Sequence, residues 1–280
     1  MSVTVTSYID GTAVSPTRTD PHAESFRDVI NTTQSGKYGW LSQQVVDNTR
    51  IVFSRPGEPS RYQNGTLKVT VKPNDHPIAS VGERSELLWM LNSSGDDENG
   101  SSGTQYYGVS LYLPSSWVDT SGWCIPVQLH GPDNAGSSQN IPVFALDVSK
   151  VPNHYTLTQA GGDNSAVIRL DTDLGTHVYD TWVDFLFKVT WAIDNTGATS
   201  VWTRTGGVGQ LVAKQVGTGT TITPWNTPTL YSAGGVALSH YWKRGLYRNP
   251  EVFASTLYAS SFSRAANEAD AAWAAFGQWP

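Results

Sequence analysis

Three short segments of the sequence carry polar or ionisable side chains at every second position. They are "RSEL" (84–87), "QLH" (128–130) and "YWKRGLYR" (241–248). Residues i and i+2 of a β-strand lie on the same face of a sheet. The groups that share a face are then Arg84 with Glu86, Gln128 with His130, and Tyr241 with Lys243 and Tyr247. Because burying such groups without partners is costly, these faces are expected to meet one another or to line a wet groove.

This set of side chains suits the removal of a proton α to a carboxylate, followed by loss of a β-alkoxide. Arg84 and Gln128 offer donors to the carboxylate, and each such donor is worth roughly 3 kcal/mol in a preorganised site. His130, with an ordinary pKa of ~6.5, is a neutral base near pH 7. Tyr247, with an ordinary pKa of ~10, serves as the acid, or as the base if Lys243 favours its phenolate form.

Other classes of reaction would use fewer of these side chains or would need groups that the sequence does not offer. Glycoside hydrolysis needs two carboxylates, and Glu86 is the one that is strongly placed, with Asp184 as the candidate for the second. The segment "GGVGQ" (206–210) lacks the Lys-Ser/Thr of a phosphate-binding loop, and the sequence has no Gly-x-Ser-x-Gly motif.

Each residue also has a purely structural interpretation. Arg84 and Glu86 form a simple ion pair in that interpretation, and His130 is a hydrogen-bonded structural histidine. Lys243 is then a solvated cation on an edge strand, and the tyrosines pack across strands. The occurrence of all these groups together, with consistent parity, favours the catalytic interpretation.

The elements that must position these groups are predicted to be β-strands. The chain has 280 residues, of which 15% are charged, and it is rich in Gly, Ser, Thr, Asn and Trp. Short alternating runs such as "QYYGVSLYLP" (105–114) and "DTWVDFLFKVTWAID" (180–194) are bounded by Gly, Pro, Asn and Asp. They indicate one antiparallel β-sandwich domain over 1–280. "IDNTGATSVW" predicts a hairpin, and 265–280 is a helical or irregular tail, with Asn267 as the helix N-cap.

Charge and composition exclude several functional classes. The net charge of −6 argues against nucleic acid as a partner. No apolar run reaches the length of a membrane span, and no signal peptide is visible at the start. Cys124, the single cysteine, is expected to be a small buried hydrophobe. The acidic segment "NSSGDDENGSSG" (92–103) is predicted to be a solvated loop, in preference to a calcium site.

The three segments, in this order, resemble the signature strands of the jelly-roll polysaccharide lyases, in which Arg-x-Glu, Gln-x-His and Tyr-x-Lys-x-Gly-x-Tyr line the cleft. The regions 180–202 and 243–263 look most like the branch of the glucuronan lyases and heparin lyase I. The alginate lyases of the same fold usually follow the last tyrosine with Asn-Gln, whereas this chain has Arg248-Asn249. The resemblance implies a concanavalin-like jelly roll, a monomer that acts outside the cell, and a structural calcium ion whose ligands are not assigned.

The resemblance also implies roles for the residues. His130 and Tyr247 are the proton-transfer pair, and Gln128 and Arg84 bind the carboxylate. Substrate-binding roles are predicted for Lys243, Tyr241, Glu86 and Arg248. Gly245 leaves a gap on the same face that is expected to admit a sugar ring. No cofactor is required for this chemistry.

The expected function is therefore cleavage of a uronic-acid polymer by β-elimination. The acidic chain favours a polyuronate that is less charged than sulfated polymers, and β-1,4-glucuronan is the preferred substrate. Alginate is an alternative substrate. A non-catalytic, lectin-like carbohydrate-binding module is an alternative function, in which tryptophans stack on sugars. The tryptophans considered for it are Trp40, Trp117, Trp202 and Trp242.

Overall fold

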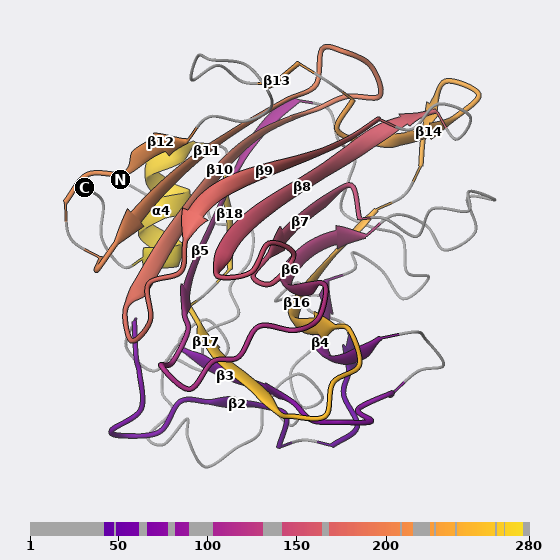
Figure 1. The fold of residues 1–280 in the computed structure, drawn as a ribbon. Helices are drawn as coiled ribbons and strands as arrows, with labels where there is room; N and C mark the ends of the chain where they lie inside the picture. The colour runs from indigo at the N-terminus through magenta and orange to yellow at the C-terminus, as the bar shows by residue number, and fades with distance from the viewer. Residues whose placement is uncertain are drawn as a thin grey trace.

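The computed structural model describes residues 42–47, 49–61, 66–77, 82–89, 103–130, 142–163, 168–207, 209–214, 225–226, 228–238, 240–260, 262–265 and 267–276. More than half of these residues are in β-strands, which form two sheets packed face to face (Figure 1). The predicted β-sandwich of jelly-roll type is confirmed. None of the helices in this part of the chain has the length and apolar character needed to cross a membrane.

The first sheet, called the front sheet, holds all three polar segments. Its order is β1-β4-β16-β6-β7-β8, with β9 and β14 also paired to β8 and β15 paired to β14. The pairing of β14 with β8 is parallel, and the other pairings are antiparallel. Its strands are β1 (Ser42–Gln44), β4 (Glu83–Trp89), β6 (Cys124–His130), β7 (Phe144–Asp147), β8 (His154–Asp163), β9 (Ile168–Thr176), β14 (Tyr231–Ala233), β15 (Val236–Ala237) and β16 (Tyr241–Arg248).

The second sheet, called the back sheet, has the order β12-β11-β10-β5-β17-β3-β2, with β13 paired to β11 and β18 paired to β5. The helix α4 (Glu268–Phe276) packs on its outside (Figure 1), where Ala271 and Ala275 meet Gly108. The strands are β2 (Ile51–Phe53), β3 (Leu67–Val71), β5 (Gly103–Tyr112), β10 (Trp182–Trp191), β11 (Ala198–Thr205), β12 (Val212–Lys214), β13 (Trp225–Asn226), β17 (Ser255–Ala259) and β18 (Ser263–Ala265).

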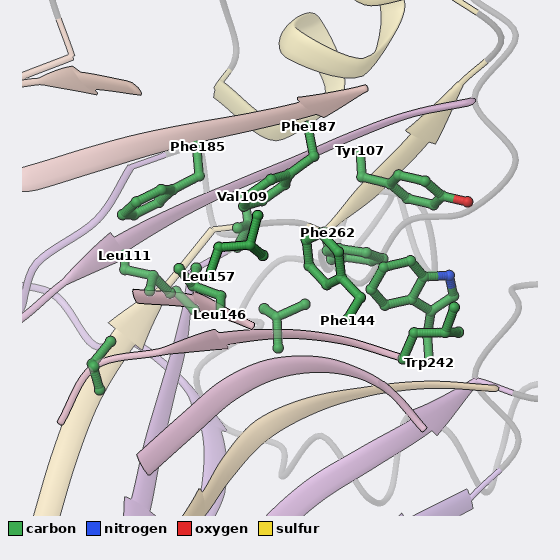
Figure 2. Close-up of a cluster of buried hydrophobic side chains, with 14 of the residues drawn as sticks. Tyr107, Val109, Leu111, Phe144, Leu146, Leu157, Phe185, Phe187, Trp242 and Phe262 are labelled. Atoms are coloured by element: carbon green, nitrogen blue, oxygen red, sulfur yellow. The ribbon is translucent and has the colours of Figure 1, made fainter. Parts of the chain in front are cut away.

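The apolar core lies between the two sheets and is built from the alternate side chains that point inward. Figure 2 shows part of it, where Trp242 of the front sheet meets aromatic side chains of both sheets. Its ring lies 4.7 Å from that of Tyr107 and 5.5 Å from that of Phe144, measured between centroids. Cys124 is fully buried in this core, as predicted, and burial raises the pKa of its thiol.

Local sequence signals predicted several elements correctly and missed one long strand. The predicted hairpin is formed by β10 and β11, and the amide of Gly197 closes its turn by donating to the carbonyl of Asp194. The C-terminal helix begins directly after Asn267. β8 was not predicted. It is buried on both faces along most of its length, and its alternation of polar and apolar residues covers only 154–158, before Gln159 and two glycines.

β16 lies between β4 and β6, and its path contains a bulge. Arg244 pairs with Val127 but Tyr247 pairs with Ile125, so β16 carries one extra residue in this interval. The interval on β6 contains Pro126, which has no amide hydrogen to donate to the ladder. The irregular pairing therefore falls where regular hydrogen bonding is already impossible.

Gly245 occupies the bulge and is required there by its conformation. Its φ is +146°, and a Cβ at this position would overlap the carbonyl oxygen of Ser85 and lie 2.8 Å from the Cα of Glu86. The missing side chain thus allows the close approach of β4. The expectation that the gap admits a sugar ring is wrong, because the space is taken by the backbone of β4.

We expect Gly245→Ala to lower the free energy of unfolding by roughly 3 kcal/mol, because it combines positive φ with overlap against a backbone. Denaturant unfolding measures this loss. Gly234→Ala is the matched control, since Gly234 has φ +58° but open space around its Cβ position. The control is expected to cost about 1–2 kcal/mol from the backbone conformation alone. Equal losses in the two variants would show that the approach of β4 has no energetic weight.

Candidate active site

The register of β4, β16 and β6 places the predicted residues on one face of the front sheet, here called the outer face. The opposite face of β16 points Trp242 and Leu246 into the core. On the outer face the paired positions are Tyr247 with Arg84, Gly245 with Glu86, Lys243 with Gln128, and Tyr241 with His130. The parity inferred from the sequence is therefore correct for all three segments.

The register also separates the two residues that were expected to transfer protons. His130 pairs with Tyr241, and Tyr247 lies six positions further along the same strand. At the rise of a β-strand, six positions correspond to about 20 Å. An acid and a base that act on neighbouring atoms of one sugar must both lie within hydrogen-bonding reach of it. The structure does not bring His130 and Tyr247 together. The polar residues of the outer face instead form two groups, one at each end of β16.

The first end of the outer face combines an imidazole, a phenol and an ammonium. The rings of His130 and Tyr241 lie 5.6 Å apart between centroids, tilted by 40°. The Nζ of Lys243 lies 5.3 Å from the centroid of the Tyr241 ring. Both rings are partly exposed, whereas Lys243 is buried. An imidazole and a phenol are both proton-transfer groups, so this end holds two of them beside a cation.

A second histidine supports this end and was missed by the sequence reasoning. His240 directly precedes Tyr241 and is fully buried. Its Nε2 accepts a hydrogen bond of 3.3 Å from the amide of Tyr231, which ties β14 to the start of β16. Burial lowers the pKa of His240 to about 4, so it is neutral near pH 7 and adds no charge beside His130. The one signal in the sequence that could have identified His240 is its position directly before the segment 241–248.

The second end of the outer face combines a guanidinium with aromatic rings. The guanidinium carbon of Arg84 lies 4.0 Å from the centroid of the Tyr247 ring. The Trp123 ring packs against Tyr247 at 4.2 Å between centroids. Arg84 also donates from Nη1 to Oε1 of Gln44, at 3.0 Å, so β1 helps to orient it. Trp123 and Gln44 were not predicted. Trp123 directly precedes the alternating segment that contains Gln128, and Gln44 lies outside all of the alternating segments.

The electrostatics of Tyr247 differ from the prediction. Lys243 was expected to lie beside Tyr247 and to lower its pKa, but Lys243 lies over Tyr241. Burial raises the pKa of Tyr247, with Glu86 acting in the same direction and Arg84 against both. Tyr247 is therefore a neutral phenol near pH 7, without the activation that the sequence suggested.

A buried carboxylate links the two ends. Nε2 of Gln128 donates to Oε1 of Glu86 at 2.5 Å, and Oε2 of Glu86 faces Nη1 of Arg84 at 3.5 Å. Gln128 and Glu86 are 0% and 1% exposed. These contacts make a continuous polar chain across β6, β16 and β4.

Arg248 does not belong to this group, and its predicted role in substrate binding is wrong. It is fully buried on the other face of β16. Its Nε and Nη2 donate to Oε2 of Glu83 at 3.1 and 2.7 Å, and its Nη1 donates to Oγ of Ser255 at 2.5 Å. Arg248 therefore ties the end of β16 to β4 and β17.

Asp184 does not lie beside Glu86, where glycoside hydrolysis would require a second carboxylate. It lies on β10 of the back sheet and is fully buried. Its Oδ2 accepts hydrogen bonds from Nη2 of Arg61 at 2.7 Å and from Nε of Arg204 at 2.8 Å. Asp184 thus holds the back sheet together and is not a second carboxylate for Glu86.

The tryptophans considered for sugar stacking are mostly packing residues. Trp117 and Trp242 are buried in the core, and Trp202 packs partly buried against the cluster under α4. Trp40 lies outside the described residues, as do the acidic residues at 96–98. Within the described ranges no three His, Cys, Asp or Glu side chains gather to hold a metal ion, and the calcium ion stays a prediction.

Solved structures with a similar fold come from two classes of polysaccharide-degrading enzyme. An endo-β-1,4-glucuronan lyase from the fungus Trichoderma reesei superposes with a TM-score of 0.60 at 15% identity, covering 96% of this chain and 98% of that chain. A glycoside hydrolase family 131 catalytic domain from Coprinopsis cinerea gives 0.51 at 16% identity, covering 89% and 90%. A family 131 β-glucanase domain from Podospora anserina gives 0.50 at 15%, covering 85% and 90%. At these identities the likeness concerns the fold alone.

The sequence itself decides between these classes. No curated protein matches it. The polysaccharide lyase family matches residues 31–263, which include all three polar segments and both ends of the outer face. The protein therefore belongs to the polysaccharide lyase family.

Proposed function

We propose that the protein cleaves a uronic-acid polymer by β-elimination at the end of the outer face formed by His130, Tyr241 and Lys243. The observation that carries the proposal is the pair of partly exposed rings, His130 and Tyr241, with an ammonium beside the phenol. Membership of the polysaccharide lyase family supports it. Tyr241 replaces Tyr247 in the pair because Tyr247 lies at the other end of β16.

The reaction uses the groups of this end without a cofactor. Lys243, together with the amide of Gln128 opposite it, neutralises the carboxylate of the uronate and so acidifies the C5 proton. One of the two rings, His130 or Tyr241, takes that proton as the C4–C5 double bond forms. The other gives a proton to O4 as the C4–O4 bond breaks. The side of the sugar on which the proton and O4 lie decides which ring is the base.

The charge of the site favours a moderately charged polymer such as β-1,4-glucuronan. The chain has a net charge of −6, which disfavours heavily sulfated polymers over the whole surface. The cation at the site, Lys243, is local and buried. The fold that the chain shares with the Trichoderma reesei glucuronan lyase is consistent with this substrate. Alginate is the second uronate to test. We propose that the protein acts outside the cell, as a monomer.

We expect incubation with glucuronan to release products that carry an unsaturated uronyl end, seen as a rise in ultraviolet absorbance. Alginate, hyaluronan and heparin complete the panel, and reducing ends are measured in parallel. New reducing ends without the double bond would indicate hydrolysis, as in the family 131 enzymes that share the fold. Polymer binding without any cleavage would instead indicate a lectin-like module.

We expect Tyr241→Phe to lower kcat on the order of 1,000-fold, because it removes one of the two proton-transfer groups. Tyr247→Phe is the matched control on the same strand and face, and it should keep kcat within about tenfold of the unaltered protein. Steady-state kinetics on the preferred polymer measures both variants, and thermal unfolding checks that each is folded. The reverse order of effects would move the chemistry to the Arg84 end.

A further inference from the structure

The hydrogen bond between Gln128 and Glu86 joins two strands that are not neighbours in the sheet. β4 and β6 both pair with β16, one on each side of it. Their Cα atoms are therefore about two strand spacings apart, or ~10 Å. The amide and the carboxylate nevertheless meet at 2.5 Å, so both side chains reach across β16.

The two side chains extend from neighbouring outward positions of the paired strands. Gly245 pairs directly with Glu86, and Lys243, two positions earlier, pairs with Gln128. A larger residue at 245 would add a side chain close to the backbone of Glu86. The glycine thus allows the close approach of β4, the strand that carries Glu86.

The carboxylate determines which way the amide of Gln128 faces. An ionised carboxylate accepts hydrogen bonds and does not donate them, so the amide atom that meets Glu86 at 2.5 Å is the nitrogen. That nitrogen carries a second hydrogen. With one hydrogen held by Glu86, the second has a fixed direction relative to Lys243 and His130, which share the outer face with Gln128.

We propose that Glu86 is a positioning residue that acts through Gln128. This inference rests on the proposed function, since it assigns to Gln128 the carboxylate of a uronate. Glu86 holds the amide nitrogen so that a donor is already in place when the substrate carboxylate arrives. Arg84, at 3.5 Å on the same strand, balances the charge of Glu86, which would otherwise repel that carboxylate.

The contacts of Glu86 differ from the substrate-binding role that the sequence suggested. Its side chain is 1% exposed, and both of its oxygens face protein groups, Oε1 facing Gln128 and Oε2 facing Arg84. A contact that stabilises bound substrate and transition state equally affects KM, whereas a contact that strengthens only as charge develops in the transition state affects kcat. The two roles therefore give different kinetics.

A double-mutant cycle on kcat tests the proposal, with the unaltered protein, Glu86→Ala, Gln128→Ala and the double variant. Misplacement of a catalytic group by about 1 Å costs on the order of 100-fold, so each single variant is expected to lose about that much kcat, with KM nearly unchanged. Because Glu86 acts through Gln128, the double variant should be no slower than Gln128→Ala. Glu86→Gln keeps an acceptor for the amide and should recover about tenfold over Glu86→Ala.

Glu83 supplies the matched control, because it is a second buried glutamate on β4 that pairs with an arginine, Arg248 of β16. Combining Glu83→Gln with Gln128→Ala should give additive effects on kcat. Additive effects of Glu86 and Gln128, or a change in KM alone, would overturn the proposal. If Glu86→Ala does not fold, the same double-mutant cycle is measured with Glu86→Gln in its place. If the unaltered protein cleaves no uronate, the proposed function fails first, which is a different result from cleavage that is insensitive to Glu86.

Discussion

The arrangement of the outer face depends on one buried carboxylate. Glu86 accepts from Gln128 on one side and faces Arg84 on the other, and all three side chains are nearly inaccessible. A buried charge without partners costs several kcal/mol, so each member of this chain requires the others. The constraint extends to the backbone, because the contact passes over β16 at Gly245. A polar chain of this kind links β6 to β4 across β16, which apolar packing from the core side alone does not do.

The two faces of β16 divide the tasks of stability and chemistry between alternate residues. Trp242 and Leu246 enter the core, and Arg248 clamps the strand to its neighbours. Tyr241 and Lys243 face outward beside His130. Because the side-chain period of a strand is two, the outward residues can differ between proteins without changes in the core. Lyases and hydrolases with the same sandwich are an expected consequence of that independence.

The sequence was sufficient to predict which residues share a face, but not which residues are neighbours along it. Parity follows from the period of two and was correct for Arg84 and Glu86, and for Gln128 and His130. Register depends on pairing between distant segments, and no local pattern reports it. Tyr241 and Tyr247 have the same parity, so only the structure shows that Tyr241 is the one beside His130. The error over Lys243 has a different cause, because Tyr241 is two positions from Lys243 on the same strand and Tyr247 is four, so spacing along the strand already placed Lys243 nearer to Tyr241.

Burial in this site also changes what each residue type can be expected to do. On the sequence, Arg248 and Lys243 are both cations of one strand, yet one is bonded to Glu83 and the other lies over Tyr241. Their parity differs, and that difference already separates a structural cation from a cation of the outer face. Tyr247 shows the opposite case, since its parity is right but burial raises its pKa and its neighbour is a guanidinium. Residue type and parity therefore restrict the set of catalytic residues, and the contacts made in the folded sheet select among them.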